Sequence, residues 1–253
     1  MVRLGQNFLA DPNLLDAILR DAGLEDGDVV LEVGAGEGVL TERLAEAAAH
    51  VHTVELDRGL EAELAALAAR PDVDLHWADA MSFDFAGLRP APTAMVANLP
   101  YAVATPVILR TIEALPRLER WTVMVQREIA ERLRAAPGSR TYGAPSVLAQ
   151  LSCEVRMLRT VDPAVFRPRP RVESAIVALR RTGPAAGPAV RSLVRAAFAH
   201  RRKSLARSLE HATPGSLAPA RAALAELGLA EDARAEALKP EDFVALAAKL
   251  EAT

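Results

Sequence analysis

Between residues 29 and 41 the chain reads Val29-Val-Leu-Glu-Val-Gly-Ala-Gly-Glu-Gly-Val-Leu-Thr41. A short apolar run leads into Gly34, Gly36 and Gly38, and a helix-period pattern follows them. Glycines at such a junction let the backbone turn tightly and approach a ligand closely. The spacing is G-x-G-x-G, and Val39 stands where a dinucleotide-binding loop would have its third glycine. The segment predicts a strand, a turn and a helix, and leaves open a nucleotide-like ligand, a dinucleotide or no ligand.

Short apolar runs alternate with longer helix-period stretches on both sides of this glycine-rich segment. The order strand, helix, strand predicts an α/β fold with a mostly parallel sheet and helices on both faces. The last two predicted strands are joined by Val161–Arg171, which contains three prolines and no helical stretch, so we expect an antiparallel end to the sheet. The predicted strands are Val29–Val33, His50–Leu56, Asp74–Ala78, Ala94–Asn98, Trp121–Gln126, Glu154–Thr160 and Ser174–Arg180, and the predicted helices are Leu14–Ala22, Leu40–Ala49, Arg58–Ala69, Pro106–Leu115 and Arg127–Ala135.

A break in composition falls at Thr182-Gly-Pro-Ala-Ala-Gly-Pro188, which is typical of a linker. Only helical patterns follow it, so we expect a small helical domain of roughly 65 residues after the linker. The sequence therefore predicts two domains, residues 1–182 with the sheet and residues 183–253 without one. The helices expected in the second domain are Ala189–His200, Lys203–His211, Ala218–Leu227 and Pro240–Leu250.

The composition of the 253 residues is that of an ordinary globular protein, with 51% hydrophobic and 25% charged residues. No uncharged apolar run reaches the ~18 residues that a membrane span needs, and Met1–Ala10 has no apolar core of signal-peptide length. Cys153 is the only cysteine, which excludes an internal disulfide framework and a multi-cysteine zinc site. We expect a soluble, cytoplasmic monomer with no membrane or metal partner.

Charge is unevenly distributed along the chain, although the formal net charge is only −3. Residues 1–120 carry a net charge of −11, residues 121–211 carry +11 and residues 212–253 carry −3. The preference for Arg over Lys, 27 to 3, explains the type of cation but not the scarcity of acids in the middle of the chain. This distribution indicates a surface that faces a polyanion on an otherwise acidic protein.

Two carboxylates follow the next two predicted strands along the chain. Glu55, at the tip of the second strand, can accept hydrogen bonds from both hydroxyls of a ribose, and Asp79, after the third, can accept one from an adenine amino group. Ligands of open α/β sheets lie outside the carboxyl ends of the strands. Together with the glycine-rich segment, these acids describe an adenosine pocket without pyrophosphate recognition, which favours S-adenosylmethionine over NAD.

The fourth predicted strand ends in Asn98-Leu-Pro-Tyr101, which resembles the Asn/Asp-Pro-Pro-Tyr motif of amino-group N-methyltransferases. An adenine N6 amine is a poor nucleophile because its lone pair is delocalised into the ring. The Asn98 side-chain oxygen and the Leu99 carbonyl can accept its two N–H groups and stabilise the charge that develops during methyl transfer. Pro100 holds the turn rigid, and Tyr101 offers a ring on which the base can stack.

Further segments, in the same order along the chain, closely resemble the KsgA (RsmA) family of small-subunit rRNA adenine dimethyltransferases. The resemblance extends from about Leu4 to Leu250. Two departures are Ala102 and Ala104, which replace the Asn and Ser that often follow Asn-Leu-Pro-Tyr in the family. The segments are Leu4-Gly-Gln-Asn-Phe-Leu9, Val125-Gln-Arg-Glu128, Tyr142-Gly-Ala-Pro-Ser-Val147, Val165-Phe-Arg-Pro-Arg-Pro-Arg-Val-Glu-Ser174 and Phe198-Ala-His-Arg-Arg-Lys-Ser-Leu205.

The resemblance implies a Rossmann-like class I methyltransferase sheet, a helical C-terminal domain that binds rRNA, and S-adenosylmethionine as cofactor. It implies transfer of two methyl groups to N6 of each of two adjacent adenosines in the 3′-terminal hairpin loop of 16S rRNA, within the assembling 30S subunit. Phe166 matches an aromatic residue that closes over the target base opposite Tyr101. The catalytic residues would be Asn98, Leu99, Pro100, Tyr101 and Phe166, and the cofactor contacts Asn7, Leu9, Gly34, Gly36, Glu55, Asp79 and Asn98.

A protein that modifies a base in structured RNA must take the base out of its stack and hold the phosphates. Basic residues flank Phe166 and recur in the helical tail, so we expect a phosphate-binding groove between the domains. Two alternatives are an Erm-type 23S rRNA adenine methyltransferase that confers macrolide resistance, and a catalytically silent ribosome-assembly factor. The five histidines show no zinc-type spacing with other strong ligands and are interpreted as structural or surface residues. The proposed RNA contacts are Arg167, Arg169, Arg171, Arg201, Arg202 and Lys203.

Overall fold

The computed structural model describes residues 8–9 and 11–251 of the chain, which divide into two compact units. The first unit comprises the chain up to Ala130 together with Glu154–Arg181. The second comprises Glu131–Cys153 and the chain from Thr182 onward. The expected division after residue 182 therefore differs from the structure in one respect, because Glu131–Cys153 groups with the helical tail and not with the sheet.

The contacts of Glu131–Cys153 explain this difference. It contains helix α6 (Ala144–Gln150), which packs against α7 (Pro188–Phe198) and α10 (Pro240–Glu251). Tyr142 is buried, and its hydroxyl donates a hydrogen bond of 3.0 Å to the Leu238 carbonyl. Glu131–Cys153 therefore packs against residues near the C-terminal end of the chain, although a strand of the sheet follows it in the sequence.

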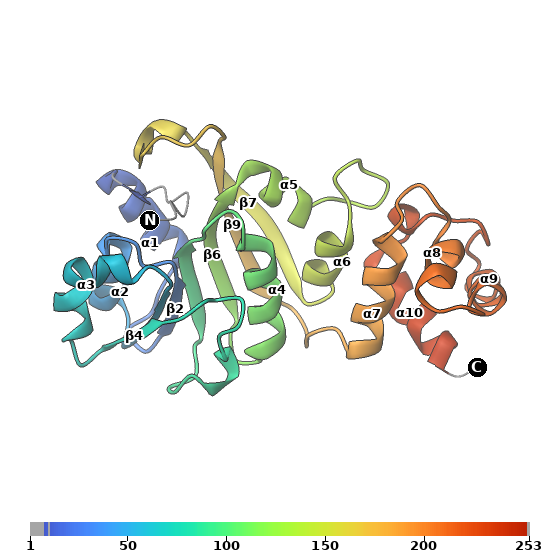
Figure 1. The fold of residues 1–253 in the computed structure, drawn as a ribbon, viewed down its shortest axis with the longest axis horizontal. Coiled ribbons are helices and arrows are strands. Elements are labelled where there is room, and N and C mark those ends of the chain that lie inside the picture. The colour runs from blue at the N-terminus through green and yellow to red at the C-terminus, as the bar shows by residue number, and fades with distance from the viewer. Residues whose placement is uncertain (1–7, 10, 252–253) are drawn as a thin grey trace. The chain divides into compact units, whose positions relative to one another are not determined.

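A seven-stranded sheet, in the order β4-β3-β2-β5-β6-β9-β7, forms the centre of the first unit (Figure 1). Neighbouring strands from β4 to β6 are parallel, and β9 is antiparallel to β6, which confirms the antiparallel strand expected at this side of the sheet. Every residue of β2 is buried, as a parallel strand covered on both faces requires. Each strand lies within one residue of its expected ends: β2 (Val29–Val33), β3 (His50–Glu55), β4 (Val73–Trp77), β5 (Ala94–Asn98), β6 (Arg120–Gln126), β7 (Cys153–Val161) and β9 (Ser174–Arg181).

Helices pack against this sheet, which confirms the α/β fold. Helix α1 packs against β6 and β9, α2 against β3, and α3 against β4. A separate antiparallel pair joins β1 (Phe8–Leu9) to β8 (Phe166–Arg167), with Leu9 opposite Phe166. The helices of this unit are α1 (Pro12–Ala22), α2 (Val39–Ala47), α3 (Glu61–Ala68) and α4 (Ala104–Ala114), with α5 (Arg127–Leu133) at the division between the units and 3-10 turns at Arg58–Leu60, Phe85–Gly87 and Pro163–Val165.

The second unit is helical and includes the orange and red helices of Figure 1. The partly buried Phe198 has its ring 5.9 Å from that of Tyr142 and 5.8 Å from that of Phe243. In the described part of the chain, no helix is long and apolar enough to span a membrane. Beside α6, α7 and α10, the unit contains α8 (Leu205–Ala212), α9 (Leu217–Glu226) and a 3-10 turn at Ala235–Ala237.

Candidate active site

A cavity of about 420 Å³ lies at the carboxyl ends of β2, β3, β4 and β5. The strand order changes direction between β2 and β5, because β3 follows on one side and β6 on the other. Ligands of open α/β sheets bind at such a topological switch point, and the volume is that of a small-molecule site. The residues that line the cavity include Glu32, Gly34, Gly36, Glu55, Asp79 and the turn Asn98–Tyr101.

The glycine-rich turn after β2 forms one wall of the cavity. Gly34 and Gly36 have φ angles of +87° and +56°, a region that glycine occupies without strain. The Gly34 N–H donates to the Val54 carbonyl at 2.8 Å, which joins the turn to β3. A Cβ atom on Gly34 would lie only 3.2 Å from Cδ of Pro100. The glycine-rich turn is therefore in contact with the turn that follows β5, and a side chain at position 34 would displace one of them.

Two carboxylates at the ends of β3 and β4 line the same cavity, as the sequence analysis expects of their positions. Glu55 is buried, and its carboxylate accepts hydrogen bonds from Gly36 N at 3.0 Å and from the N–H groups of the next two residues at 2.8 Å. Asp79 is exposed and accepts from Met81 N at 2.8 Å. Backbone donors thus orient both carboxylates, which retain lone pairs for the hydroxyl or amino groups of a ligand.

A third carboxyl group, Glu32 on β2, lines the cavity and was not singled out by the sequence analysis. Its Oε2 accepts hydrogen bonds from Thr41 at 2.6 Å and from Thr53 at 2.8 Å, whereas its buried Oε1 has no hydrogen-bond partner among the described residues. Burial raises the pKa of Glu32 to about 7, against the lowering effect of the two threonine hydroxyls. The sequence signal was an acid inside an otherwise apolar strand, Val-Val-Leu-Glu-Val.

The turn Asn98–Tyr101 is fixed by its own backbone. The N–H of Leu99, a buried residue, donates to the Met124 carbonyl on β6 at 3.0 Å. The Pro100 carbonyl accepts from Val103 N at 3.1 Å, at the start of the path into α4. The turn therefore presents Asn98 to the cavity from a rigid backbone that two neighbouring elements hold.

Tyr101 is held by a residue that the sequence analysis did not assign to the site. Its hydroxyl forms a hydrogen bond of 2.6 Å with Oγ of Ser174, the first residue of β9. Burial raises the pKa of Tyr101, so the hydroxyl stays protonated at neutral pH. Ser174 ends the segment Val165–Ser174 that the sequence analysis singled out, and the antiparallel β9 brings it to the carboxyl ends of β5 and β6.

The structure does not bring Phe166 to this cavity. The Phe166 side chain is 2% exposed and belongs to a hydrophobic cluster with Leu9, Ile18 and Val161. It is absent from the described residues that line the cavity, whereas Leu9, its backbone neighbour across the β1–β8 pair, is among them. Asn7, another expected contact, lies outside the described residues.

The six expected RNA contacts all lie on exposed surface, in two groups. Arg167, Arg169 and Arg171 belong to the first unit, and Arg169 lies 3.6 Å from Asp162. The second unit contains Arg201, Arg202 and Lys203, of which Arg201 pairs with Glu236 at 3.3 Å. With the residues that the structure describes, Arg167, Arg171 and Arg202 form no ion pair, so their guanidinium groups are available to phosphates.

The charge of the cavity decides between two classes of nucleotide ligand. Its described lining contains no Lys, Arg or His and four acids. A dinucleotide would bring two phosphates next to these carboxylates, whereas an adenosine derivative with a positive charge would be attracted to them. The unpartnered Oε1 of Glu32 also fits a cationic or N–H donor group. The four acids are Glu32, Glu37, Glu55 and Asp79.

Comparison with protein families gives one match over almost the whole chain. The model of the family described as ribosomal RNA adenine dimethylase matches residues 2–252. The chain is 50% identical over 248 residues to ribosomal RNA small subunit methyltransferase A of Rubrobacter xylanophilus, with 96% of this chain and 92% of that protein covered. It is 46% identical to the protein of the same name from Streptomyces avermitilis, with 96% and 85% covered.

Two solved structures resemble the fold over nearly its full length. A dimethyladenosine transferase from Plasmodium falciparum matches with a TM-score of 0.80 and 26% identity, covering 94% of this chain and 95% of that one. The 23S rRNA methyltransferase ErmE matches with a TM-score of 0.68 and 28% identity, covering 97% of this chain and all of that one. Both likenesses include the sheet and the helical unit.

Proposed function

The chain belongs to the ribosomal RNA adenine dimethylase family, and we propose that its cavity transfers methyl groups from S-adenosylmethionine to N6 of two adjacent adenosines of 16S rRNA. The protein is a small-subunit rRNA adenine dimethyltransferase. One observation carries the mechanism: the turn Asn98–Tyr101 lines the same cavity as four carboxylates, with no cation among the lining residues that the structure describes. The proposal includes the 3′-terminal hairpin loop as the target, the assembling 30S subunit as the partner, and a monomer that acts in the cytoplasm.

The residues of the cavity fit this cofactor. S-adenosylmethionine, when bound, supplies a methyl group on a positively charged sulfur. Glu55 and Asp79 would accept hydrogen bonds from the ribose hydroxyls and the adenine amine, since backbone donors already orient both carboxylates. Gly34 and Gly36 let the backbone approach closely, and Leu9 adds apolar surface. Glu32 would accept an N–H donor through its free Oε1.

Asn98 and Leu99 would hold the amine that accepts the methyl group. An adenine N6 group has two N–H donors, and the Asn98 side-chain oxygen and the Leu99 carbonyl provide two acceptors on one rigid turn. These acceptors stabilise the positive charge that develops on N6, which is electrostatic stabilisation of the transition state. Pro100, in contact range of Gly34, keeps this turn against the glycine-rich turn.

Tyr101 would support the base by stacking, with its ring fixed through Ser174. Phe166 acts indirectly in the observed conformation, since its buried ring packs beside Leu9, which lines the cavity. Arg167, Arg169 and Arg171 would contact phosphates from the first unit, and Arg201, Arg202 and Lys203 from the second. Such contacts are independent of sequence and weaken as salt increases.

The test is methyl transfer to separated substrates. The full chain is incubated with labelled S-adenosylmethionine and small subunits that lack the methylation, and the nucleosides are analysed for N6,N6-dimethyladenosine. A parallel incubation contains 23S rRNA, and a third contains the Asn98→Ala variant. We expect dimethyladenosine in the small subunits alone.

Two results would contradict the proposal and identify an alternative. Methylation of 23S rRNA without methylation of small subunits would indicate the Erm-type activity. Tight binding of small subunits without any methyl transfer would indicate a catalytically silent assembly factor. Retention of the intact turn Asn98–Tyr101 argues against the latter, because binding alone does not require it.

A further inference from the structure

Four side chains with the chemistry of metal ligands lie on one face of two neighbouring strands. Strand β3 begins His50-Val-His52, and β4 contains Asp74-Leu-His76. Successive side chains of a strand alternate between the two faces of a sheet, so the two members of each set share a face. The parallel register places His52 beside Asp74, which brings both sets to the same face. We name these four residues the histidine cluster.

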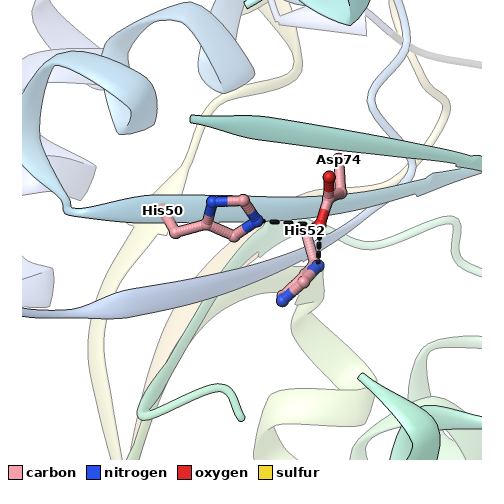
Figure 2. A group of neighbouring side chains, drawn as sticks. All are labelled: His50, His52 and Asp74. Carbon is pink, nitrogen blue, oxygen red and sulfur yellow. Dashed lines mark hydrogen bonds and ion pairs between the residues drawn. The ribbon is translucent and has the colours of Figure 1, made fainter. Parts of the chain in front are cut away.

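Three members of the histidine cluster, His50, His52 and Asp74, place donor atoms within 4.8 Å of one another (Figure 2). Asp74 Oδ2 lies 2.9 Å from His50 Nε2 and 3.2 Å from His52 Nδ1, and Figure 2 shows both imidazole rings directed at this carboxylate. His76 Nε2 lies 3.4 Å from His52 Nδ1. In a tetrahedral zinc site, where bonds to nitrogen and oxygen are ~2.0–2.2 Å long, neighbouring donors are about 3.3 Å apart. The observed separations already approach this value.

His52 is oriented by a hydrogen bond to a backbone carbonyl. Its Nε2 lies 2.9 Å from the Pro90 carbonyl oxygen, which can only accept, so Nε2 carries the proton. In the neutral ring, Nδ1 therefore carries a lone pair, which faces Asp74 Oδ2 at 3.2 Å and can accept a hydrogen bond from His76 Nε2 at 3.4 Å. A cation between Nδ1 and the carboxylate would be attracted to both acceptor atoms.

We propose that the histidine cluster binds one divalent transition-metal ion, with Zn²⁺ as the ion that suits it best. Two imidazole nitrogens and one carboxylate oxygen lie within 4.8 Å of one another, and Zn²⁺ takes such ligands in tetrahedral geometry. His76, with Nε2 3.4 Å from His52 Nδ1, or a water molecule would take the fourth position. The hydrogen bond from His52 to Pro90 is the outer contact that metal-bound histidines commonly make through their second nitrogen. The expectation of no metal rests on spacing along the chain, whereas these ligands meet across two strands.

The histidine cluster is separate from the methyl-transfer cavity. None of its four residues lines that cavity, and they occupy the first part of β3 and β4, before the strand ends that carry Glu55 and Asp79. The Asp74 side chain is 46% exposed and His50 is partly exposed, so an ion can enter from solvent. Since β4 is the outermost strand of its side of the sheet, a bound ion would fasten this edge to β3. The site is therefore structural.

Metal uptake by the full chain tests the proposal. The protein is stripped with a chelator, dialysed, and titrated with Co²⁺ and then with Zn²⁺. We expect one Co²⁺ per chain, the intense visible absorption of tetrahedral cobalt, displacement by Zn²⁺, and a higher midpoint of thermal unfolding with Zn²⁺. Asp74→Asn and His50→Asn change partly exposed ligands and should each weaken Zn²⁺ binding by at least about 10–100-fold.

The matched control is His211→Asn, in the second unit. His211 lies next to another histidine, with 4.9 Å between its ring and that of His200, but outside the histidine cluster. This variant should bind one ion as the unchanged chain does. Equal affinity in all three variants, or a loss in the control as large as in Asp74→Asn, would overturn the proposal. The cobalt spectrum of the unchanged chain tests the proposal even if a ligand variant fails to fold. Absence of the tetrahedral bands from that spectrum would exclude the site.

Discussion

Strand β3 carries a different kind of chemistry at each of its ends. At its carboxyl end, Glu55 is surrounded by backbone N–H donors and by a glycine-rich turn, next to a cavity whose described lining contains acids and no cation. At its amino end, His50 and His52 share one carboxylate with a neighbouring strand. The first arrangement depends on loops, and the second depends mainly on side chains of paired strands, with the Pro90 carbonyl as an outer contact of His52.

This difference shows why the two regions suit different ligands. Parallel strands all end at one edge of the sheet, and the turns that follow them supply backbone groups and can enclose a molecule the size of a nucleoside. The face of two paired strands offers no such space, but it places side chains at fixed separations of a few ångströms. An organic cofactor fits the former and a single ion the latter.

The largest effect is expected from Asn98→Ala, which tests whether the two regions act independently. Removing one preorganised group that stabilises transition-state charge costs about 10²–10³ in kcat. We expect at least that loss of methyl transfer to small subunits, with RNA binding and Zn²⁺ uptake at the level of the unchanged chain. Full methylation by this variant would contradict the role of Asn98, and a loss of Zn²⁺ uptake would show that the regions are coupled.

Gly34→Ala should have the next largest effect, because it disturbs two turns of the cavity together. The alanine would adopt a φ of +87° and place its Cβ 3.2 Å from Pro100 Cδ. Strain of this kind costs about 1–2 kcal/mol of stability, and a displacement of about 1 Å in the Asn98 turn lowers kcat by about 10²-fold. Gly27→Ala is the control, since nothing lies within 4 Å of a Cβ there. Urea unfolding measures the loss of stability, and methyl transfer measures the loss of kcat. Equal results for the two variants would contradict a contact between position 34 and Pro100.

The sheet is predictable from the sequence because most of its strands are short, largely apolar runs bounded by turn residues. The same logic places Glu55, Asp79 and Asn98 at strand ends, since parallel strands end at one edge. Helix α6 is not predictable in this way, because it has seven residues and is stabilised by helices from the end of the chain. The role of Phe166 stays a prediction, since in the structure its side chain joins the hydrophobic cluster around Leu9.

The other features that the sequence does not predict are contacts between segments that are distant along the chain. Ser174 reaches Tyr101 only because β9 runs antiparallel to β6, and its residue type gives no hint of this. The histidine cluster depends on the register of β3 against β4, and a shift by one residue would place the members of one strand on the other face. Patterns such as His-x-His and Asp-x-His become informative only when the strands are known to be neighbours.

A smaller effect is expected from Glu32→Gln, a change on β2, where Glu32 lies beside Thr53 of β3. Glu32 has a pKa of about 7 in the folded chain against 4.5 when unperturbed, so above pH 4.5 the unfolded chain loses a proton that the folded chain keeps. The stability of the unchanged chain should therefore fall by up to about 3 kcal/mol between pH 4.5 and 7.

The glutamine variant lacks this dependence while it can still accept from Thr41 and Thr53. It should gain stability relative to the unchanged chain as pH rises, which urea unfolding at pH 5 and pH 8 would measure. Glu37→Gln, at an exposed residue of the adjoining turn, is the control and should follow the unchanged chain. If the stability of all three proteins depended on pH in the same way, the proton that the folded chain keeps would belong to a group other than Glu32.

The smallest effect is expected from Tyr101→Phe, which tests whether β9 contributes, through Ser174, to the site at the carboxyl ends of the strands. The variant keeps the ring and loses only the hydrogen bond to Ser174, a contact worth about 0.5–1.5 kcal/mol, so methyl transfer should fall about 2–10-fold. Tyr101→Ala also removes the stacking surface and should lose a further ~1–3 kcal/mol of transition-state binding.

Ser174→Ala should match Tyr101→Phe in methyl transfer. The double variant Tyr101→Phe with Ser174→Ala should be no worse than either single variant, because both changes remove the same hydrogen bond. Additive losses would mean that Ser174 contributes by another contact, and that β9 is part of the site for a reason other than Tyr101.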